Sequence, residues 1–358
     1  MTHTFKLARR MARFRALAAA PALLLAIACN SSDSTSPTPI PPFPDGVGDS
    51  QNPTDRSPDP GSSSASPTGI PFGPTSAWDG VELKAHTDLF TGSFAAVSPS
   101  HIVGRIATAR ASGERVILAM TGGHQRYLTS FGRGKEFDRK KWDARLWEFN
   151  TAAIKAAVAA GVADGTIIGA DVMDEPHVHG HGDGNTWGPE GTMTKARVDS
   201  LCRSVKEMFP TAPVGVSHQH DAFEPDKSYQ VCDFVISQYA ARKGDVNAFR
   251  EGGLALARRD GHAIAFSINI LNGGVQASGD GRWKCLPGTT QGRGTYDPNC
   301  RMSAQQVRDW GLALGPAGCA MLMWRYDATF MSDPANQQAF KDVAAALAQA
   351  PGRSCRRS

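Results

Sequence analysis

Residues 166–176 read TIIGADVMDEP, an apolar and β-branched run that ends in two acids and a proline. Runs of this kind recur along the chain, and amphipathic segments with helical spacing separate them. The other runs lie at 115–121, 213–217, 234–239, 263–269 and 319–326, with weaker ones at 82–86 and 94–97. Strands that alternate with helices pair in parallel through right-handed crossovers. About eight such strands predict an α/β fold, a (β/α)8 TIM barrel.

The helices between these strands are expected to begin at capping residues. Ser98-Pro99 is typical of an N-cap and first helical position, and Asp138 opens a helix that we expect to end at Gly161. Further helices are expected at 193–208, 245–258, 303–314 and 333–350. An open doubly wound sheet is the alternative fold. No glycine-rich phosphate fingerprint follows the first clear strand, which disfavours a nucleotide-binding sheet.

The first 28 residues have the features of an export signal. Residues 1–15 are basic, and residues 16–28 form an apolar run shorter than the roughly 20 residues that span a membrane. Cys29 follows Leu-Ala-Ile-Ala directly, and this resembles the bacterial lipobox, whose cysteine is acylated. The resemblance implies an exported lipoprotein, anchored to a membrane and facing the periplasm or the cell surface. An ordinary signal peptide, cut near Ala28, is the alternative.

The segment behind Cys29 is rich in Pro, Ser, Thr, Asp and Gly, and it holds nearly half of the 23 prolines. Such a composition buries too little apolar surface to offset the entropy cost of ordering the chain. We therefore expect a signal peptide at 1–28, a disordered tether at 29–76 and a barrel domain at 77–352.

The formal charge of +4 is concentrated at the N-terminus, because residues 1–28 hold five bases and no acid. The rest of the chain is near neutral. This excludes the broad basic surface of a nucleic-acid binder, so we expect no nucleic-acid partner. A neutral body fits an uncharged, hydroxyl-rich substrate. The sequence indicates no oligomeric state.

Six of the seven cysteines remain if Cys29 carries lipid. An even number in an exported protein predicts disulfides, although six cysteines allow 15 pairings. A bond at 285–300 would close a glycine-rich loop, and one at 319–355 would tie the last helix to the strand before it. The resulting candidates are Cys285–Cys300, Cys319–Cys355 and, as the remainder, Cys202–Cys232. Buried free thiols are the alternative; a metal site is disfavoured because no CxxC pair is present.

Polar and aromatic residues follow the carboxyl ends of the predicted strands. In a barrel these ends converge on one mouth, where active sites lie. The candidates for binding substrate there are His86, His124, Trp187, His218, Tyr239, Asn269, Trp324 and Asp327. Tryptophans such as Trp187 suit stacking against the apolar face of a sugar ring.

The acids at the end of 166–176 are the candidate catalytic residues. A strand period of two predicts that Asp171, Met173 and Glu175 share one face and that Asp174 lies on the other. Neighbouring carboxylates beside apolar residues acquire different pKa values, which makes one of them a usable proton donor. The alternative is a strand-terminating turn with solvated acids.

A barrel strand that ends in Asp174-Glu175-Pro176 resembles the clan A glycoside hydrolases, in which Asn-Glu-Pro after the fourth strand supplies the general acid/base. The resemblance implies that Glu175 is the acid/base and that Asp174 stands at the Asn position. The run 323–326 (MWRY) is similar to the Trp-bearing eighth strand of that clan.

The chain departs from the clan at the seventh strand, where retaining members carry a Glu nucleophile. Residues 265–272 (AFSINILN) contain no acid. A two-carboxylate mechanism needs a partner for Glu175, and the candidates are Asp171, Asp221 and Asp327.

Histidines alternate at 177, 179 and 181 and again at 218 and 220, a pattern that could ligate a metal. The glycine-rich loop around the first three favours hydrogen bonds to substrate hydroxyls instead, so we expect no metal and no cofactor. The hypothesis is a lipid-anchored glycoside hydrolase-like enzyme with a carbohydrate substrate. The alternatives are a non-catalytic carbohydrate-binding barrel and a metal-dependent hydrolase.

Overall fold

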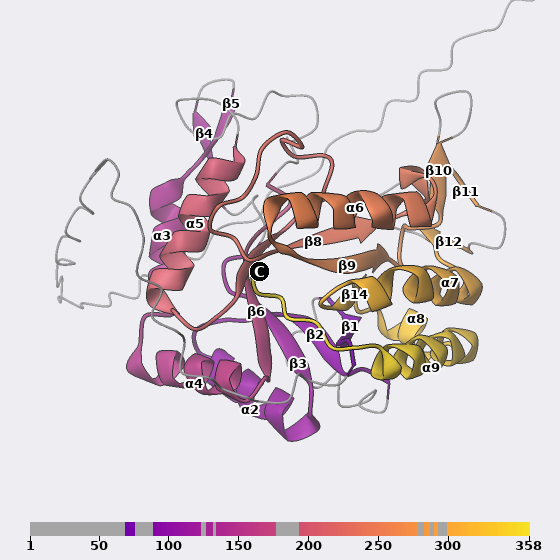
Figure 1. The fold of residues 1–358 in the computed structure, drawn as a ribbon, viewed down its shortest axis with the longest axis horizontal. Helices are drawn as coiled ribbons and strands as arrows, with labels where there is room; N and C mark the ends of the chain where they lie inside the picture. The colour runs from indigo at the N-terminus through magenta and orange to yellow at the C-terminus, as the bar shows by residue number, and fades with distance from the viewer. Residues whose placement is uncertain are drawn as a thin grey trace, which may run out of the picture. The chain divides into compact units, whose positions relative to one another are not determined.

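The computed structural model describes residues 69–75, 89–122, 127–131, 134–176, 193–277, 283–286, 290–292 and 299–358. These residues belong to one compact unit, Ser63–Ser358. Within this described part, one eight-stranded parallel sheet carries the fold, with the order β1-β14-β9-β8-β7-β6-β3-β2 (Figure 1). Helices lie around the outside of the sheet.

The sheet closes on itself. Its strands are β1 (Phe72–Pro74), β2 (Gly92–Ala96), β3 (Arg115–Ala119), β6 (Ile167–Asp174), β7 (Val214–Ser217), β8 (Phe234–Tyr239), β9 (Ala263–Asn269) and β14 (Met321–Trp324). The Thr91 amide donates to the Phe72 carbonyl at 3.0 Å, and Thr75 forms a parallel bridge with Phe94. These contacts join the two edge strands, so the predicted (β/α)8 barrel is confirmed and the open sheet is wrong.

Most helices begin at capping residues that the sequence offers, but the expected start at Ser98-Pro99 is wrong, because the N-cap of the first described helix is His101 and its side chain makes no capping hydrogen bond. They are α2 (Ile102–Ser112), α3 (Arg139–Trp147), α4 (Ala152–Ala163), α5 (Lys195–Met208), α6 (Val246–Asp260), α7 (Ala304–Leu314), α8 (Ala328–Ser332) and α9 (Pro334–Gln349). The single helix expected from Asp138 to Gly161 is wrong, because the chain forms α3 and α4 there. Thr151 has an extended backbone, and its side chain accepts a hydrogen bond from the Ile154 amide, so a second helix starts.

Shorter elements complete the described chain. The 3-10 turns are η2 (Ala241–Lys243) and η3 (Gly315–Ala317). Three hairpins pair β4 (Leu128–Phe131) with β5 (Gly134–Phe137), β10 (Val275–Ala277) with β11 (Trp283–Cys285), and β12 (Thr290–Gly292) with β13 (Asn299–Arg301). No helix among the described residues is long and apolar enough to cross a lipid bilayer.

The first barrel strand lies earlier than the sequence predicted. β1 falls inside the segment 29–76 that we expected to be a disordered tether, so that expectation is wrong for residues 69–75. Ile70 and Phe72 are buried, and the Phe72 ring packs against Phe90 and Phe340 with centroids 5.7 and 6.4 Å apart. The strand expected at 82–86 lies outside the described residues.

The lower half of the barrel interior is filled by apolar side chains, including Ile117, Phe234 and Leu322. The Phe234 ring fits because two neighbouring strands carry glycine beside it. A Cβ at Gly169 would come within 2.6 Å of that ring, and one at Gly215 within 2.5 Å. Side chains larger than glycine are therefore excluded at both positions.

The segment after α9, residues 351–358, closes the amino-terminal end of the barrel, where Figure 1 shows the C-terminus near the barrel centre. Cys355 is buried with the interior cluster, and Arg357 donates to the Cys232 carbonyl at 3.2 Å. The barrel domain thus extends beyond the predicted boundary at residue 352. The three expected disulfides are confirmed as Cys202–Cys232, Cys285–Cys300 and Cys319–Cys355.

Replacement of both Cys319 and Cys355 by alanine should lower the free energy of unfolding by about 2–4 kcal/mol, because the bond closes a long loop and fills the barrel floor. Thermal and denaturant unfolding would measure the loss. Ser354→Ala, an exposed change in the same segment, should stay within about 0.5 kcal/mol of the parent. Equal stability of all three proteins would contradict this role for the segment.

Candidate active site

A cavity of about 220 Å³ opens at the carboxyl ends of the barrel strands. Every barrel strand except β3, or the turn that follows it, contributes to the wall. The lining residues are Thr75, Phe94, Asp174, Glu175, Ser217, His218, Gln219, Ile236, Gln238, Arg242, Lys243, Ser267 and Trp324. This is the mouth at which (β/α)8 barrels carry their active sites.

A β-bulge at the end of β6 decides which acids reach the cavity. Asp171 pairs with Gly215 and Asp174 with Ser217, so β6 advances three residues while β7 advances two. The extra residue breaks the alternation, and Val172 and Met173 both pack in the core outside the barrel. The predicted face of Asp171, Met173 and Glu175 is therefore wrong: Asp174, instead of Met173, lines the cavity.

Asp171 lies outside the cavity lining and is 1% exposed. The Ser217 hydroxyl donates to its Oδ1 at 3.0 Å, whereas Oδ2 has no hydrogen-bond partner among the described residues. Burial, and then the charge of Asp174, raise the pKa of Asp171 well above its ordinary value. The site thus favours the protonated form of this carboxyl.

The Asp174 side chain is exposed to the cavity, and the protein atoms of the cavity wall surround it. This burial, together with the charge of Glu175, raises the pKa of Asp174 to about 7. A carboxyl that titrates near neutrality can both donate and accept a proton under physiological conditions.

Glu175 ends the strand in a left-handed backbone conformation, with φ of 52°. Its amide donates to the Ser217 carbonyl at 2.7 Å, which fixes the turn. A non-glycine residue in this region costs roughly 1–3 kcal/mol, and such strain concentrates at functional sites. Burial raises the pKa of Glu175, while the charges of Arg242 and Lys243 act in the opposite direction. The net shift is towards the protonated form that a general acid needs.

The opposite wall offers hydrogen-bonding and stacking groups. The Ser267 hydroxyl on β9 is buried and has no hydrogen-bond partner among the described residues. Trp324, half-buried at the end of β14, presents an aromatic surface, and the peptide bond that follows it is cis. The Asn269 amide donates to Gln238 at 3.2 Å and so stabilises this wall from within. A polyhydroxylated ligand would find both kinds of contact here.

His218 lines the cavity with both ring nitrogens already engaged. Nδ1 lies 2.8 Å from the Gln219 carbonyl, which can only accept, so Nδ1 carries the proton. Nε2 lies within hydrogen-bond distance of the Tyr229 hydroxyl, at 2.9 Å, and burial raises the pKa of Tyr229 so that this hydroxyl keeps its proton. His218 therefore presents a ring of fixed orientation to the cavity.

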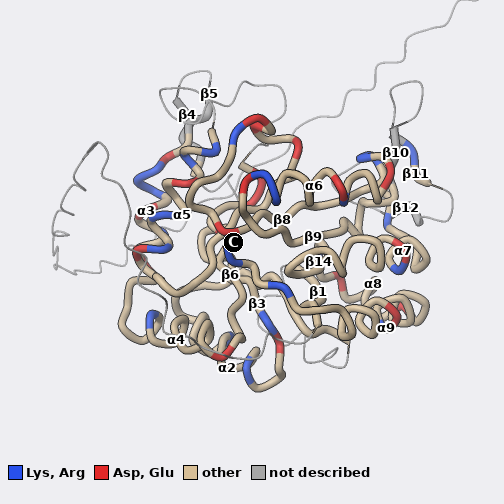
Figure 2. Tube along the Cα trace, viewed as in Figure 1, with Lys and Arg blue, Asp and Glu red and all other residues tan. Residues whose placement is uncertain are grey.

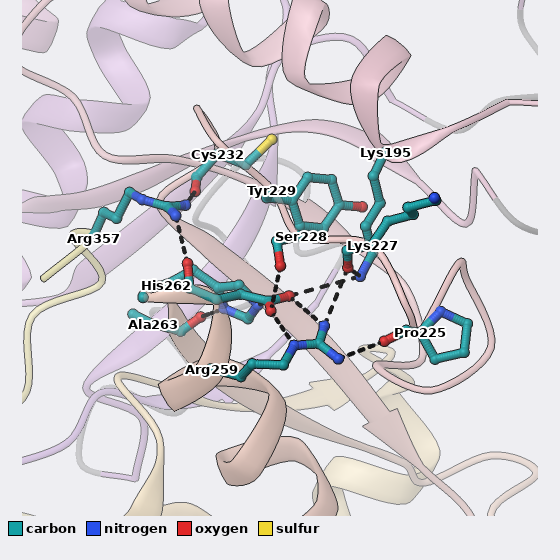
Figure 3. A network of polar contacts seen from close by, with 12 residues as sticks. Lys195, Pro225, Lys227, Ser228, Tyr229, Cys232, Arg259, His262, Ala263 and Arg357 are labelled. Atoms are coloured by element: carbon teal, nitrogen blue, oxygen red, sulfur yellow. Dashed lines mark hydrogen bonds and ion pairs between the residues drawn. The ribbon is translucent and has the colours of Figure 1, made fainter.

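A polar network behind the wall holds Tyr229 (Figure 3). The Lys195 ammonium lies 5.1 Å from the Tyr229 ring centroid and donates to the Lys227 carbonyl at 2.6 Å. Asp260 accepts from Ser228 at 2.8 Å and from the Arg259 guanidinium. This network connects the loop at 225–229 to the ends of α5 and α6, and it fixes the partner that orients His218.

Other predicted site residues lie apart from the cavity lining. The Tyr239 hydroxyl donates to the Gly244 carbonyl at 2.6 Å, and its ring packs on Phe249 and Trp310. Asp327 caps α8 by accepting from the Phe330 amide at 2.9 Å. His86, His124, Trp187 and the histidine loop at 177–181 lie outside the described residues.

Among the described residues that line the cavity, only Asp174 and Glu175 carry carboxylates, and β9 contributes Ser267. No group of three or more His, Cys, Asp or Glu in the described part could hold a metal. Sequence reasoning missed Arg242 and Lys243, although their position just after β8 was a usable signal.

No protein-family model matches the sequence, and no curated protein matches it. Structures with a similar fold include a GH113 β-1,4-mannanase, with 13% identity, a TM-score of 0.46, and coverage of 77% of this chain and 99% of that one. A GH5_18 structure from Streptomyces cattleya in complex with GlcNAc has 12% identity, coverage of 81% and 83%, and a TM-score of 0.46. A D-psicose 3-epimerase in the presence of D-fructose has 14% identity, coverage of 78% and 97%, and a TM-score of 0.40. At such identities the similarity concerns the fold alone.

Because folding raises the pKa of Asp174, this residue makes the free energy of unfolding fall as the pH rises. A carboxyl whose folded pKa is about 7 instead of 3.8 stabilises the fold at low pH, and this contribution is lost as the pH rises from about 4 through 7. The melting temperature of Asp174→Asn should therefore exceed that of the parent by an amount that grows with pH over that window. The two melting curves should differ by a constant amount below about pH 4.

Asp342→Asn provides the contrast, because hydrogen bonds from Gln338 and Arg308 lower the pKa of the exposed Asp342. Its melting temperature should fall relative to the parent as the pH rises through the acidic range. Parallel pH profiles for the parent and Asp174→Asn would refute the assignment for Asp174.

Proposed function

We propose that this protein hydrolyses glycosidic bonds of a polysaccharide or glycoconjugate, with Glu175 as the general acid/base. The observation that carries the proposal is the placement of Glu175 beside Asp174 at the end of the fourth barrel strand, within the cavity. Both carboxyls have raised pKa values, and Trp324 from the eighth strand lines the same space. This supports the clan A resemblance at the strand where that clan carries its acid/base.

In this proposal, protonated Glu175 donates its proton to the glycosidic oxygen as the bond to the anomeric carbon breaks. The charge of Glu175 raises the pKa of Asp174, so the two carboxyls titrate as a coupled pair that holds one proton over a range of pH. In the singly protonated pair, the ionised carboxyl stabilises the positive charge that develops on the sugar ring and accepts a proton from the attacking water. Asp171, kept neutral, lets Asp174 ionise without a second negative charge in contact. Ser267 would bind a substrate hydroxyl, and Trp324 would stack on a sugar ring.

A carbohydrate-binding barrel without turnover is the second candidate. It is favoured by the lack of a carboxylate on β9 among the described lining residues, since retaining clan members need a Glu there. Binding without hydrolysis across a glycan panel would select this candidate over the first.

Glu175→Gln should reduce hydrolysis by roughly two orders of magnitude or more, because the amide cannot transfer the proton. Reducing-end release from a panel of polysaccharides and oligosaccharides would measure it. Glu251→Gln, an exposed change on α6, is the matched control and should retain parental rates. Full activity of Glu175→Gln would refute the assignment.

We further propose that Cys29 is acylated and that the barrel is held at a membrane by the tether behind it. The lipobox-like sequence supports this, and the three disulfides fit an oxidising compartment. In cells fed an alkyne-labelled fatty acid, the parent should incorporate label and fractionate with membranes. Cys29→Ser should remain unlabelled; equal labelling of both proteins would refute the lipid site.

A further inference from the structure

Two cations line the cavity beside the candidate acids. Arg242 and Lys243 belong to η2, the turn that follows β8, and both reach the cavity wall. Both act on Glu175, since their charges lower its pKa against the effect of burial. The wall is therefore basic close to the point where a sugar would be cleaved.

Lys243 is half-buried, and its ammonium makes no ion pair or hydrogen bond within the described part of the chain. Burial, and then the charge of Arg242, lower the pKa of Lys243, while the charges of Asp221 and Glu175 raise it less. An ammonium partly removed from water and left unpaired is unfavourable. An anion in the cavity would relieve this cost.

The turn that carries these cations is held in place. The Ala241 amide donates to the Gly273 carbonyl at 2.8 Å, and the Tyr239 hydroxyl donates to the Gly244 carbonyl at 2.6 Å. Gly244 has φ of 85°, a conformation that favours glycine. The backbone that carries Lys243 is therefore fixed before any ligand arrives, which lowers the entropy cost of binding.

The basic wall is a local feature. Over the described chain, Lys and Arg alternate with Asp and Glu around the outer helices (Figure 2). The cavity lining holds Arg242 and Lys243 together with Asp174 and Glu175, and burial raises the pKa of both carboxyls. As the pH falls through about 7 and Asp174 is protonated, the cavity becomes more positive and attracts anions more strongly, and its low-dielectric walls concentrate that field.

We propose that Lys243, with Arg242 beside it, binds an anionic substituent on the sugar, so that the substrate is an acidic glycan carrying a carboxylate or a sulfate. This inference rests on the proposed glycosidic function, because it assigns the substrate class of the same cavity. A guanidinium binds a carboxylate or sulfate through paired hydrogen bonds, and an ammonium adds a point charge.

The test compares three ligands by calorimetry on the purified Glu175→Gln protein, which removes turnover. The ligands are an oligogalacturonide, its methyl ester, which keeps the same sugar backbone without charge, and a sulfated galactan oligosaccharide. At least one acidic ligand should bind about tenfold or more tightly than the neutral ester. Its affinity should fall as salt is raised, whereas that of the ester should not.

Lys243→Gln in this background should lose about tenfold or more in affinity for the acidic ligand and leave binding of the ester unchanged. Lys243→Arg should restore most of the affinity, because it keeps the charge. Lys341→Gln, an exposed change on α9, is the matched control and should have no effect. The preferred acidic ligand identifies the substituent as a carboxylate or a sulfate.

Two results would overturn the inference: neither acidic ligand binds more tightly than the ester, or Lys243→Gln weakens charged and neutral ligands equally. Failure of the proposed function is distinguishable from both. Lys243-dependent binding of an acidic glycan that the parent does not cleave would refute hydrolysis and retain the subsite. Glu175-dependent cleavage of neutral glycans that Lys243→Gln leaves unchanged would refute the subsite and retain hydrolysis.

Discussion

The extra residue in β6 between Asp171 and Asp174 is the constraint on which the candidate site depends. In a regular strand, Met173 would face the barrel interior and Asp174 the surrounding helices. The bulge is fixed from outside: the Val172 carbonyl accepts from the Thr121 hydroxyl at 2.6 Å and from the Trp142 indole at 3.1 Å. Val172 and Met173 are thereby kept in the outer core, and three acids gather at one strand end. Packing outside the barrel thus determines the electrostatics inside it.

The sequence predicted the parts of this fold that depend on local pattern. Long apolar strands such as β6 and β9, and well-capped helices such as α7, can be predicted from the residues of the element itself. β1 escaped prediction because it is three residues long in a proline-rich context, and its burial depends on Phe90 and Phe340, which are distant in sequence. The bulge in β6 was not predicted, because it is a shift of register relative to β7 and the residue pattern of one strand does not encode its pairing with another.

The residues of the candidate site were likewise predictable only where local pattern places them. Residues directly at a strand end, such as Glu175, His218 and Trp324, were identifiable and do line the cavity. Tyr239 also ends a strand, but its side chain packs under η2 instead. Lys243 was missed because residues in a turn resemble ordinary surface charge until the turn is known to fold back over the mouth. A net charge near zero over the body says nothing about such a local wall, since the field in a cavity depends on its nearest few groups.

The pairing of β1 with β14 has a consequence for how the protein is made. Residues 72–74 are synthesised early, yet their neighbours at 321–324 are made only after almost all of the other described residues. Segment 351–358, which covers the barrel floor, comes later still. The barrel therefore cannot close until β14 has been made, and its incomplete forms expose a strand edge and an open interior. Exposed strand edges of this kind can pair with other chains, so the late synthesis of β14 makes the unfinished barrel prone to association.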